Sequence, residues 1–276
     1  SQFYGRKIYA FMPIEAGGVN SMLPIAASAR MGLPLVDADG MGRAFPELQM
    51  VTFTIGGVSA TPMALTDEKG NCVIFQTITN KWTEELARAV TMSCGGSVSV
   101  CLYAIEGKTL KEYAVKNIIT RSEMLGRAIR NLKNSTDGTP EDMFFKTTEG
   151  FKLFKGKITD VLRETRGAFN FGKVVLEGIG EYKGHDAYVE FQNENLLARV
   201  DGDIVATVPD LICLVDIETF VPVTTDALKY GKRVFVVGLK CFDMWRTPKG
   251  LELVGPRYFG CDTDFIPVEE RVKGVR

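Results

Sequence analysis

The sequence predicts an α/β N-terminal domain followed by a mainly antiparallel β C-terminal domain. Up to about residue 134, short apolar runs alternate with stretches in which apolar residues recur at helical spacing. After the polar stretch Asn134–Glu141, short β-rich segments are separated by glycine or Asp-Gly turns such as Asp201–Gly202. We therefore expect an α/β domain over residues 1–145, a mainly β domain over residues 146–250, and a C-terminal tail over residues 251–276 that returns toward the first domain.

The individual elements follow from these two patterns. Short β-rich runs bounded by glycine or proline predict strands in the first domain at Ile8–Ile14, Leu35–Asp37, Met50–Ile55, Cys72–Thr77 and Val98–Ile105. Helical spacing or high alanine content predicts helices at Pro24–Met31, Trp82–Cys94 and Ser122–Leu132. Strands of the second domain are expected at Gly156–Arg163, Gly172–Gly178, Ala187–Phe191, Leu196–Val200, Ile204–Val208 and Arg233–Leu239.

Composition and charge exclude several classes of protein. Of the 276 residues, 45% are hydrophobic and 24% charged, which is typical of a soluble globular protein. The 33 Lys and Arg residues balance 34 Asp and Glu residues without a basic run, so no nucleic-acid partner is expected. The longest apolar stretches, such as Arg233–Leu239, are far shorter than the ~20 residues that span a bilayer. We expect a cytoplasmic homo-oligomer without a membrane partner, and we interpret the start without methionine as a fragment or trimmed product.

The cysteines and the single histidine offer little local evidence of chemistry. No two cysteines form a C-x-x-C pair, so we expect buried, reduced thiols. His185 is the only histidine and lies in a turn, where a solvated side chain is expected; a histidine-rich zinc site is impossible within one chain. The six cysteines are Cys72, Cys94, Cys101, Cys213, Cys241 and Cys261.

The densest group of polar residues is the segment DADGMGRAFPE, which follows a predicted strand. Its charged side chains are Asp37, Asp39, Arg43 and Glu47. Ligands of open α/β sheets usually bind where strands end, and crowded carboxylates next to a cation can transfer protons, orient water or bind a metal. The competing interpretation is an Asp/Gly turn with a solvated Arg–Glu pair.

A second candidate lies between a predicted strand and a predicted helix, in the segment EAGGVNS. Its candidate binding residues are Glu15, Gly17, Gly18, Asn20 and Ser21. Paired glycines let the backbone approach a ligand, and the amides of a helix N-terminus favour an anion or a carbonyl oxygen. The alternative is a tight turn capped by Asn20 or Ser21. Neither known glycine-rich nucleotide motif is present, so no nucleotide cofactor is expected.

Two further segments are candidates for substrate binding. A cysteine–glycine turn follows the predicted helix Trp82–Cys94; because its cysteine lies at the negative end of the helix dipole, a helix cap is favoured over a nucleophile. Near the C-terminus, alternating charges lie in a glycine-punctuated stretch, for which a surface loop with an Arg–Asp pair is the alternative. The residues of the two segments are Cys94, Gly95, Gly96, Arg257, Asp262 and Asp264.

Together these motifs resemble one known family over residues 6–269. The strings that carry the resemblance are EAGGVNS, ARMGLPLVDADGMGRAFPELQM, VTMSCGGS, FQNENLLARVDG, ATVPDLICLVD and LELVGPRYFGCDTDF. They resemble the S-methyl thiohydantoin desulfurases, whose members are often encoded beside, or fused to, hydantoinase/oxoprolinase proteins. The chain departs from the family pattern in one respect: it lacks the glycine-rich GTGGGG-type segment with which members begin, so we expect it to be incomplete.

The resemblance implies a hydrolase-type enzyme that acts on a small hydantoin-like ring and releases a thiol. Asp37, Asp39 and Glu47 are then candidates for base, acid or ligands of a divalent metal, and Arg43 for orienting a carboxylate or a ring carbonyl. The amides around Gly17 and Gly18 would act as oxyanion donors. The tail is expected to bring Arg257 or Asp262 close to Asp39 or Arg43. The alternative is a non-catalytic substrate-binding or accessory subunit of a hydantoinase/oxoprolinase system.

Overall fold

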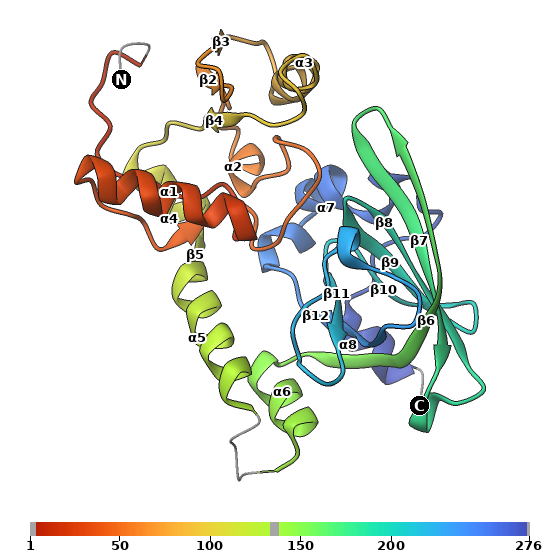
Figure 1. Ribbon diagram of the computed structural model, residues 1–276. Coiled ribbons are helices and arrows are strands. Elements are labelled where there is room, and N and C mark those ends of the chain that lie inside the picture. Colours follow the sequence, from red (N-terminus) through yellow and green to blue (C-terminus); the bar gives the residue numbers. More distant parts are fainter. Residues whose placement is uncertain (1–3, 133–137, 275–276) are drawn as a thin grey trace. The chain divides into compact units, whose positions relative to one another are not determined.

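The computed structural model describes residues 4–132 and 138–274 of the chain. The chain divides into two compact units, Ser1–Thr120 and Arg121–Arg276, and the division falls inside helix α5 (Ile118–Asn131). The first unit mixes helices with short strands, and a curled antiparallel sheet of seven strands dominates the second, which confirms the predicted fold class (Figure 1). Part of the polar stretch expected between the domains lies outside the described residues.

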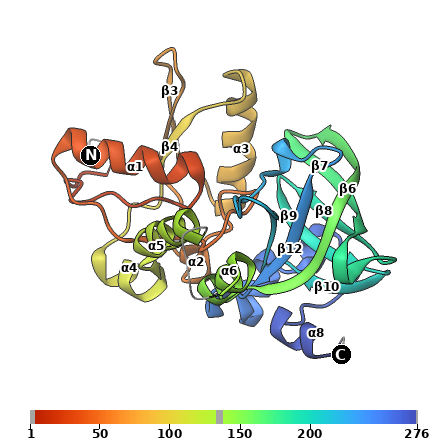
Figure 2. The ribbon, with the colours of Figure 1, turned by 60° about the horizontal axis from the view of Figure 1, so that its bottom comes forward.

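A three-stranded antiparallel sheet and one amphipathic helix form the core of the first unit. The sheet has the order β3-β2-β4, and α3 lies beside it (Figure 2). The apolar residues Met63, Leu65 and Phe75 of the sheet pack with Ala87 of α3. The helix begins after Thr79, whose side chain accepts a hydrogen bond from the Trp82 amide at 3.2 Å. The bounds are β2 (Met63–Thr66), β3 (Cys72–Phe75), β4 (Ser99–Cys101) and α3 (Asn80–Ser93).

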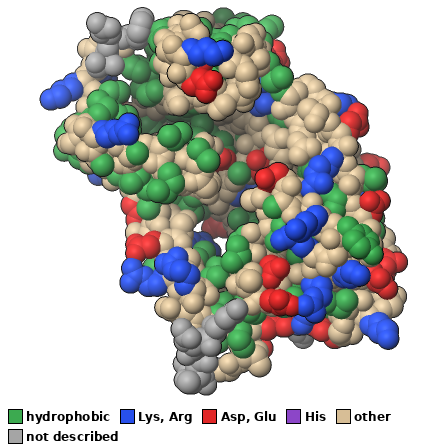
Figure 3. Space-filling model, in the orientation of Figure 1, with side chains coloured by type: hydrophobic (Ala, Val, Ile, Leu, Met, Phe, Trp, Pro, Cys, Tyr) green, Lys and Arg blue, Asp and Glu red, His purple; other side chains and the backbone are tan. Residues whose placement is uncertain are grey.

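Helix α1 (Gly18–Met31) begins earlier than predicted and leaves most of its surface open. It ends at Gly32, which adopts the left-handed conformation (φ 63°) that glycine favours at a helix C-terminus. Ser28 is its only buried residue among those described. Hydrophobic side chains are visible over α1 on the face shown in Figure 3; its large exposed ones are Val19, Met22, Leu23 and Met31.

Several short elements complete the first unit, and two sequence predictions are wrong here. Met50–Ile55 was expected to be a strand because it is rich in β-branched and aromatic residues, but it contains the helix α2 (Thr52–Ile55). Between Ile8–Ile14 and Leu35–Asp37, the structure has only an isolated parallel bridge from Phe11 to Leu35. The remaining elements are β1 (Ala38–Asp39), β5 (Val115–Lys116), which pairs with β1, and α4 (Gly107–Tyr113).

The sheet of the second unit has the order β10-β9-β8-β7-β6-β12-β11, and every neighbouring pair is antiparallel. Its core includes Phe154, Ile158, Leu176, Val189 and Ala206. The strands are β6 (Phe151–Arg166), β7 (Phe169–Gly178), β8 (Asp186–Gln192), β9 (Glu194–Val200), β10 (Asp203–Thr207), β11 (Leu211–Asp216) and β12 (Arg233–Leu239). The helices are α6 (Pro140–Thr148), α7 (Pro248–Val254) and α8 (Val268–Gly274), and short 3-10 turns cover Gly180–Tyr182, Thr225–Ala227, Asp243–Arg246 and Pro256–Phe259.

A buried charge network fixes the C-terminal segment within the second unit. Asp210 is fully buried and accepts hydrogen bonds from the amides of Cys241 (2.9 Å) and Val268 (2.7 Å) and from Arg246 (2.9 Å). Arg246 also pairs with Glu269 of α8 at 2.6 Å. Helix α8 contacts β10, as Figure 2 also shows. Because removal of one member of a buried ion pair leaves the other unpaired, this network anchors the segment strongly.

Two further findings concern membrane-spanning helices and the cysteines. Within residues 4–132 and 138–274, no helix has the length and apolar character needed to cross a membrane. All six cysteines are free thiols, but only Cys241 is buried, so the prediction of generally buried cysteines is wrong. Cys72 and Cys101 lie on edge strands of the three-stranded sheet, where one face of each strand is open to solvent.

Candidate active site

The centre of the candidate site is the carboxylate of Asp39, the last residue of β1. The side chain is completely buried, and three backbone amides donate to it: Ala16 to Oδ2 at 2.7 Å, and Met41 and Gly42 to Oδ1 at 3.1 and 2.8 Å. Gly42 has a φ of 70°, a conformation that glycine adopts without strain, and this turn brings its amide back to Asp39. Burial raises the pKa of Asp39 to about 6, although the three amides act in the opposite direction.

A second carboxylate, that of Glu15, lies close enough to Asp39 to interact with its charge. Burial raises the pKa of Glu15 above its ordinary value, and the charge of Asp39 raises it further. A hydrogen bond from Asn20 Nδ2 to Glu15 Oε1 (2.6 Å) and the charge of Arg43 act in the opposite direction. Glu15 is partly exposed, whereas Asp39 is not. The site therefore holds two interacting carboxylates with raised pKa values, and one of them is open to solvent.

The N-terminus of α1 adjoins Glu15 and carries no side-chain cap. Gly17 is the N-cap residue, and neither Asn20 nor Ser21 provides the expected cap: the Asn20 amide donates to Glu15 instead. A Cβ atom on Gly17 would lie 3.0 Å from Glu15 Oε1, so a side chain there would crowd the carboxylate. Gly18 is exposed. The free amides at the start of a helix attract an anion or a polarised carbonyl oxygen, which places such a group beside Glu15.

Arg43 is buried and supplies the positive charge of the site. Its Nε donates to the Ala44 carbonyl oxygen at 3.1 Å, and its guanidinium lies 4.9 Å from the centroid of the Phe45 ring. Its charge lowers the pKa of Glu15. Because Arg43 is only 8% exposed, the alternative of a solvated arginine in a surface turn is wrong.

Glu47 belongs to a neighbouring set of contacts that holds the loop after Arg43. It is buried, and it forms an ion pair with Lys81 at 2.5 Å and accepts a hydrogen bond from Gln49. Helix α3 contributes Glu84, which accepts from the Leu48 amide at 2.8 Å. Glu47 therefore faces α3 through Lys81, and these contacts stabilise the loop.

Asp37, two residues before Asp39, caps a helix. Its Oδ1 accepts from the amides of Ile119 (2.9 Å) and Thr120 (3.2 Å), and its Oδ2 accepts from the Thr120 hydroxyl at 2.5 Å. The hydroxyl bond, helped by the two amides, lowers the pKa of Asp37. These bonds satisfy donors of the first turn of α5, which gives Asp37 a structural role.

The cysteine–glycine turn caps helix α3. The Cys94 amide bonds to the Val90 carbonyl oxygen at 2.9 Å, and Gly95 and Gly96 follow with φ values of 95° and 91°. Left-handed glycines of this kind end helices, so the geometry is that of the cap that the sequence favoured.

The charged C-terminal candidates are all exposed and pair with one another. Arg257 Nε lies 2.6 Å from Asp264 Oδ1, and an Arg257 terminal nitrogen lies 3.6 Å from Asp262 Oδ1. This is the Arg–Asp surface pair of the alternative interpretation; the expected approach of this segment to Asp39 stays a prediction. His185 is likewise exposed and lies 2.5 Å from Asp201.

The carboxylates do not gather into a metal site within the part of the chain that the structure describes. No group of three or more His, Cys, Asp or Glu side chains among these residues has the arrangement that could hold a metal ion. Asp37, Asp39 and Glu47, the ligands suggested by the sequence, face three different sets of partners.

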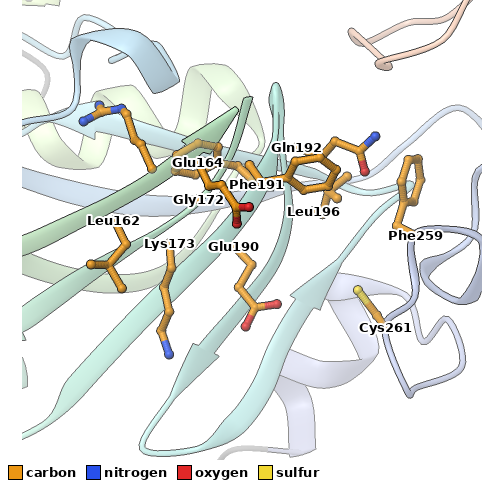
Figure 4. A pocket seen from close by; sticks show the side chains of 12 residues that line it. Leu162, Glu164, Gly172, Lys173, Glu190, Phe191, Gln192, Leu196, Phe259 and Cys261 are labelled. Carbon is orange, nitrogen blue, oxygen red and sulfur yellow. The ribbon is translucent and has the colours of Figure 1, made fainter. Parts of the chain in front are cut away.

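Sequence reasoning missed a cavity on the second unit. Leu162, Gly172, Gln192 and Phe259 are among the residues that line it (Figure 4). Gln192 belongs to the string FQNENLLARVDG, which contributed to the family resemblance but was given no role. No local pattern in the sequence singled out Gln192, because its strand, Asp186–Gln192, alternates polar and apolar residues.

Fold and site together define the class of the protein: an α/β unit in which a buried and a partly exposed carboxylate lie beside an uncapped helix, joined to an antiparallel β unit. Two family models match the chain, the S-Me-THD-like N-terminal domain over residues 1–77 and the S-Me-THD-like C-terminal domain over residues 78–268. The chain belongs to this S-Me-THD-like family, which confirms the resemblance noted from its motifs.

Comparison with other proteins adds one solved structure. A crystal structure of a protein from Chromobacterium violaceum is similar to this chain, with 25% sequence identity and a TM-score of 0.79. The match covers 97% of this chain and 75% of the other. No curated protein matches the chain. The border between the family models, at residues 77 and 78, falls inside the three-stranded sheet, because β4 lies beyond it and pairs with β2.

Proposed function

We propose that the chain hydrolyses a small hydantoin-like ring that carries an S-alkyl group, and that Glu15 transfers the proton. One observation carries the proposal: Glu15 and Asp39 are interacting carboxylates with raised pKa values, and Glu15 is the one that solvent can reach. Carboxyl groups with raised pKa values serve as acids and bases near neutral pH. The S-Me-THD-like family supports a thiohydantoin-related substrate.

In the proposed reaction, water attacks the ring carbon that carries sulfur. The Glu15 carboxylate accepts a proton from water as the new C–O bond forms, and electron density moves onto the ring. The amides at the start of α1 stabilise the charge that develops there. The C–S bond then breaks, the electron pair leaves with sulfur, and protonated Glu15 returns the proton to the thiolate. The second proton of the water, which stays on the added oxygen, then moves to the ring nitrogen as the ring carbonyl forms, so one water is consumed, one hydantoin is formed and one thiol is released.

The other acidic residues have supporting roles in this proposal. Asp39 has no exposed surface and its oxygens accept three amide hydrogen bonds, so it acts on Glu15 through its charge. Arg43 opposes that effect and keeps Glu15 able to ionise. Asp37 and Glu47 are engaged by α5 and α3 and serve the fold.

The experiment measures thiol released from an S-methyl thiohydantoin by the whole chain. Glu15→Gln should reduce turnover by about 10²- to 10⁴-fold, the range typical of a lost general acid–base group. The matched control is Glu106→Gln in the same unit, because the Glu106 side chain is exposed and forms a surface ion pair with Arg6. This variant should turn over at the wild-type rate.

The pH profile separates a positioning role of Asp39 from a structural one. The rate should rise with pH as Glu15 ionises, at a pH above that of an ordinary glutamate. Because the charge of Asp39 raises the pKa of Glu15, Asp39→Asn should move this limb to lower pH in the residual activity. Full activity of Glu15→Gln would contradict proton transfer by Glu15. An unchanged pH dependence of the rate in Asp39→Asn would contradict the effect of Asp39 on Glu15.

A second candidate function is an accessory subunit that docks on a hydantoinase/oxoprolinase partner. It is favoured by the exposed apolar side chains of α1, including Val19, Met22 and Leu23. Wild-type chain that binds the thiohydantoin without releasing thiol, while forming a stable complex with such a partner, would favour this role over hydrolysis.

A further inference from the structure

Asn20, the third residue of helix α1, points back to the glutamate that the proposed reaction uses. Side chains on a helix lean toward its N-terminus, so a residue of the first turn can contact residues that precede the helix. Asn20 Nδ2 donates to Glu15 Oε1 at 2.6 Å. The Asn20 side chain therefore contacts Glu15 and leaves the start of the helix, at Gly18, without a side-chain cap.

The residue type at position 20 fits a carboxylate partner. An ionised carboxylate only accepts hydrogen bonds, so the NH₂ group of the Asn20 amide must face Glu15. At the third position of a helix, a glutamate or glutamine often reaches back to the N-cap amide. A glutamate here would set a second negative charge against Glu15, whereas asparagine supplies a donor without a charge.

Contacts from separate segments restrict the Glu15 side chain. The Phe45 amide, in the loop after Asp39, also donates to its carboxylate. A Cβ atom on Gly17 would lie 3.0 Å from Glu15 Oε1, so this oxygen lies close to the backbone at the start of α1. A solvated glutamate samples several rotamers, and hydrogen bonds from two segments reduce that freedom. Asn20 supplies the side-chain part of this restraint.

The hydrogen bond from Asn20 also affects the charge of Glu15. Burial raises the pKa of Glu15, and the hydrogen bond from Asn20 lowers it. A donor that stabilises the ionised carboxylate favours the form that accepts a proton. Loss of this donor should therefore raise the pKa of Glu15, whereas loss of the Asp39 charge should lower it.

We propose that Asn20 is a positioning residue, whose side-chain amide holds the Glu15 carboxylate in the orientation from which it accepts a proton of the attacking water. Asn20 acts through Glu15 and takes up no proton itself. The inference rests on the proposed function of Glu15. It predicts that the donor group at position 20, and not the size of the side chain, determines the rate.

Three variants separate the donor from the size of the side chain. Asn20→Ala removes the amide. Asn20→Asp keeps the shape of the side chain but replaces the donor by an acceptor, and an aspartate in the first turn of a helix favours the fold. Asn71→Ala is the matched control, because it removes a similar hydrogen bond, from Asn71 Nδ2 to Asp67 Oδ2 at 2.7 Å, from an exposed turn of the same unit.

The first measurement is the pKa of Glu15, by NMR of the whole chain labelled with carbon-13 at the glutamate carboxyl groups. Glu15→Gln identifies the resonance. The pKa should rise in Asn20→Ala, because the donor is lost, and rise further in Asn20→Asp, because a like charge is added. Asn71→Ala should leave it unchanged. A role of Asn20 in the stability of α1 alone would not move this pKa.

The second measurement is thiol release from an S-methyl thiohydantoin. In Asn20→Ala, kcat and kcat/KM should fall together by about 10- to 100-fold, because a displaced catalytic group loses transition-state stabilisation. The pH at which the rate rises should move upward in the same variant. Asn20→Asp should lose at least as much turnover, and Asn71→Ala should turn over at the wild-type rate.

Two results would overturn the proposal: an unchanged pKa of Glu15 in Asn20→Ala, or wild-type turnover in either variant of Asn20. Circular dichroism and a thermal midpoint show whether these variants are folded, and Asn20→Asp decides alone if Asn20→Ala is not. Wild-type turnover in Glu15→Gln would end the proposed function, whatever Asn20 does. Loss of turnover in Glu15→Gln together with wild-type turnover in Asn20→Ala would end this inference alone, so the two failures are distinguishable.

Discussion

The Asp39→Asn variant tests whether ionisation of the buried Asp39 carboxylate destabilises the folded state as much as its burial indicates. Its pKa is raised from the ordinary 3.8 to about 6 by burial. One pKa unit corresponds to about 1.4 kcal/mol, so the raised pKa corresponds to about 3 kcal/mol. The folded state holds this proton more tightly than the unfolded state. Protonated Asp39 therefore stabilises the folded state fully below the pKa of the unfolded state, and this stabilisation is lost as the pH rises through about 6.

An asparagine does not ionise, so the variant lacks this pH-dependent loss. It does place an NH₂ group where one of the three amide donors needs an acceptor, which costs about 1–3 kcal/mol at every pH. The free energy of unfolding of the variant, relative to wild type, should therefore improve by about 2 kcal/mol from about pH 4 to pH 7. The lowered pKa of Glu15 in the variant adds to this change in the same direction.

Urea unfolding at several pH values measures this difference. The chain has two tryptophans, and a Trp245→Phe background leaves Trp82, on helix α3, as the reporter of the first unit. The comparison of variant with wild type at each pH removes the contributions of the other carboxylates. A difference that is constant within about 0.5 kcal/mol over this range would refute the assignment of a raised pKa to Asp39.

Other outcomes follow from the same contacts. Asp37→Ala should lower the free energy of unfolding in urea by about 1 kcal/mol, because α5 loses its cap. The variant should still release thiol; loss of thiol release would indicate that Asp37 takes part in the reaction. Asp210→Ala should lower the free energy of unfolding by about 3–5 kcal/mol, because the buried Asp210 carboxylate is lost and the partly buried Arg246 keeps its charge with one fewer partner; a loss below 1 kcal/mol would contradict the anchoring role. Cys94→Ala should lower turnover only modestly, since Cys94 caps a helix; a loss of more than about a thousandfold in a folded variant would indicate a thiol mechanism.

The fold was predictable where local pattern and tertiary contacts agree. The helix expected at Trp82–Cys94 is found at Asn80–Ser93, because its apolar spacing matches the face that packs on the sheet. The strand expected at Met50–Ile55 is wrong, because β propensity reflects packing more than an intrinsic backbone preference. In this segment the Thr52 amide and hydroxyl both bond to the Gly40 carbonyl oxygen, a contact that no local pattern reveals.

The site was predictable as a segment but not as a set of roles. Asp37 and Asp39 are the same residue type, two positions apart, and their pKa values move in opposite directions. The difference comes from partners far along the chain: Thr120 donates to Asp37, and Ala16 to Asp39. Glu15 was expected to bind substrate, and its interaction with Asp39 likewise depends on the fold. Spacing alone does not specify such partners.

The pairing of β2 with β4 determines where the chain can be cut. A fragment that stops at residue 77, the end of the first family model, would contain β2 and β3 but not β4. The backbone groups of Ala64–Thr66 would then form an open edge, and such edges pair readily with other chains. A fragment that stops at Thr120 keeps all three strands and the helix that covers them. For expression, the usable boundary is therefore the end of the compact unit, and a fragment ending at the family border is expected to aggregate.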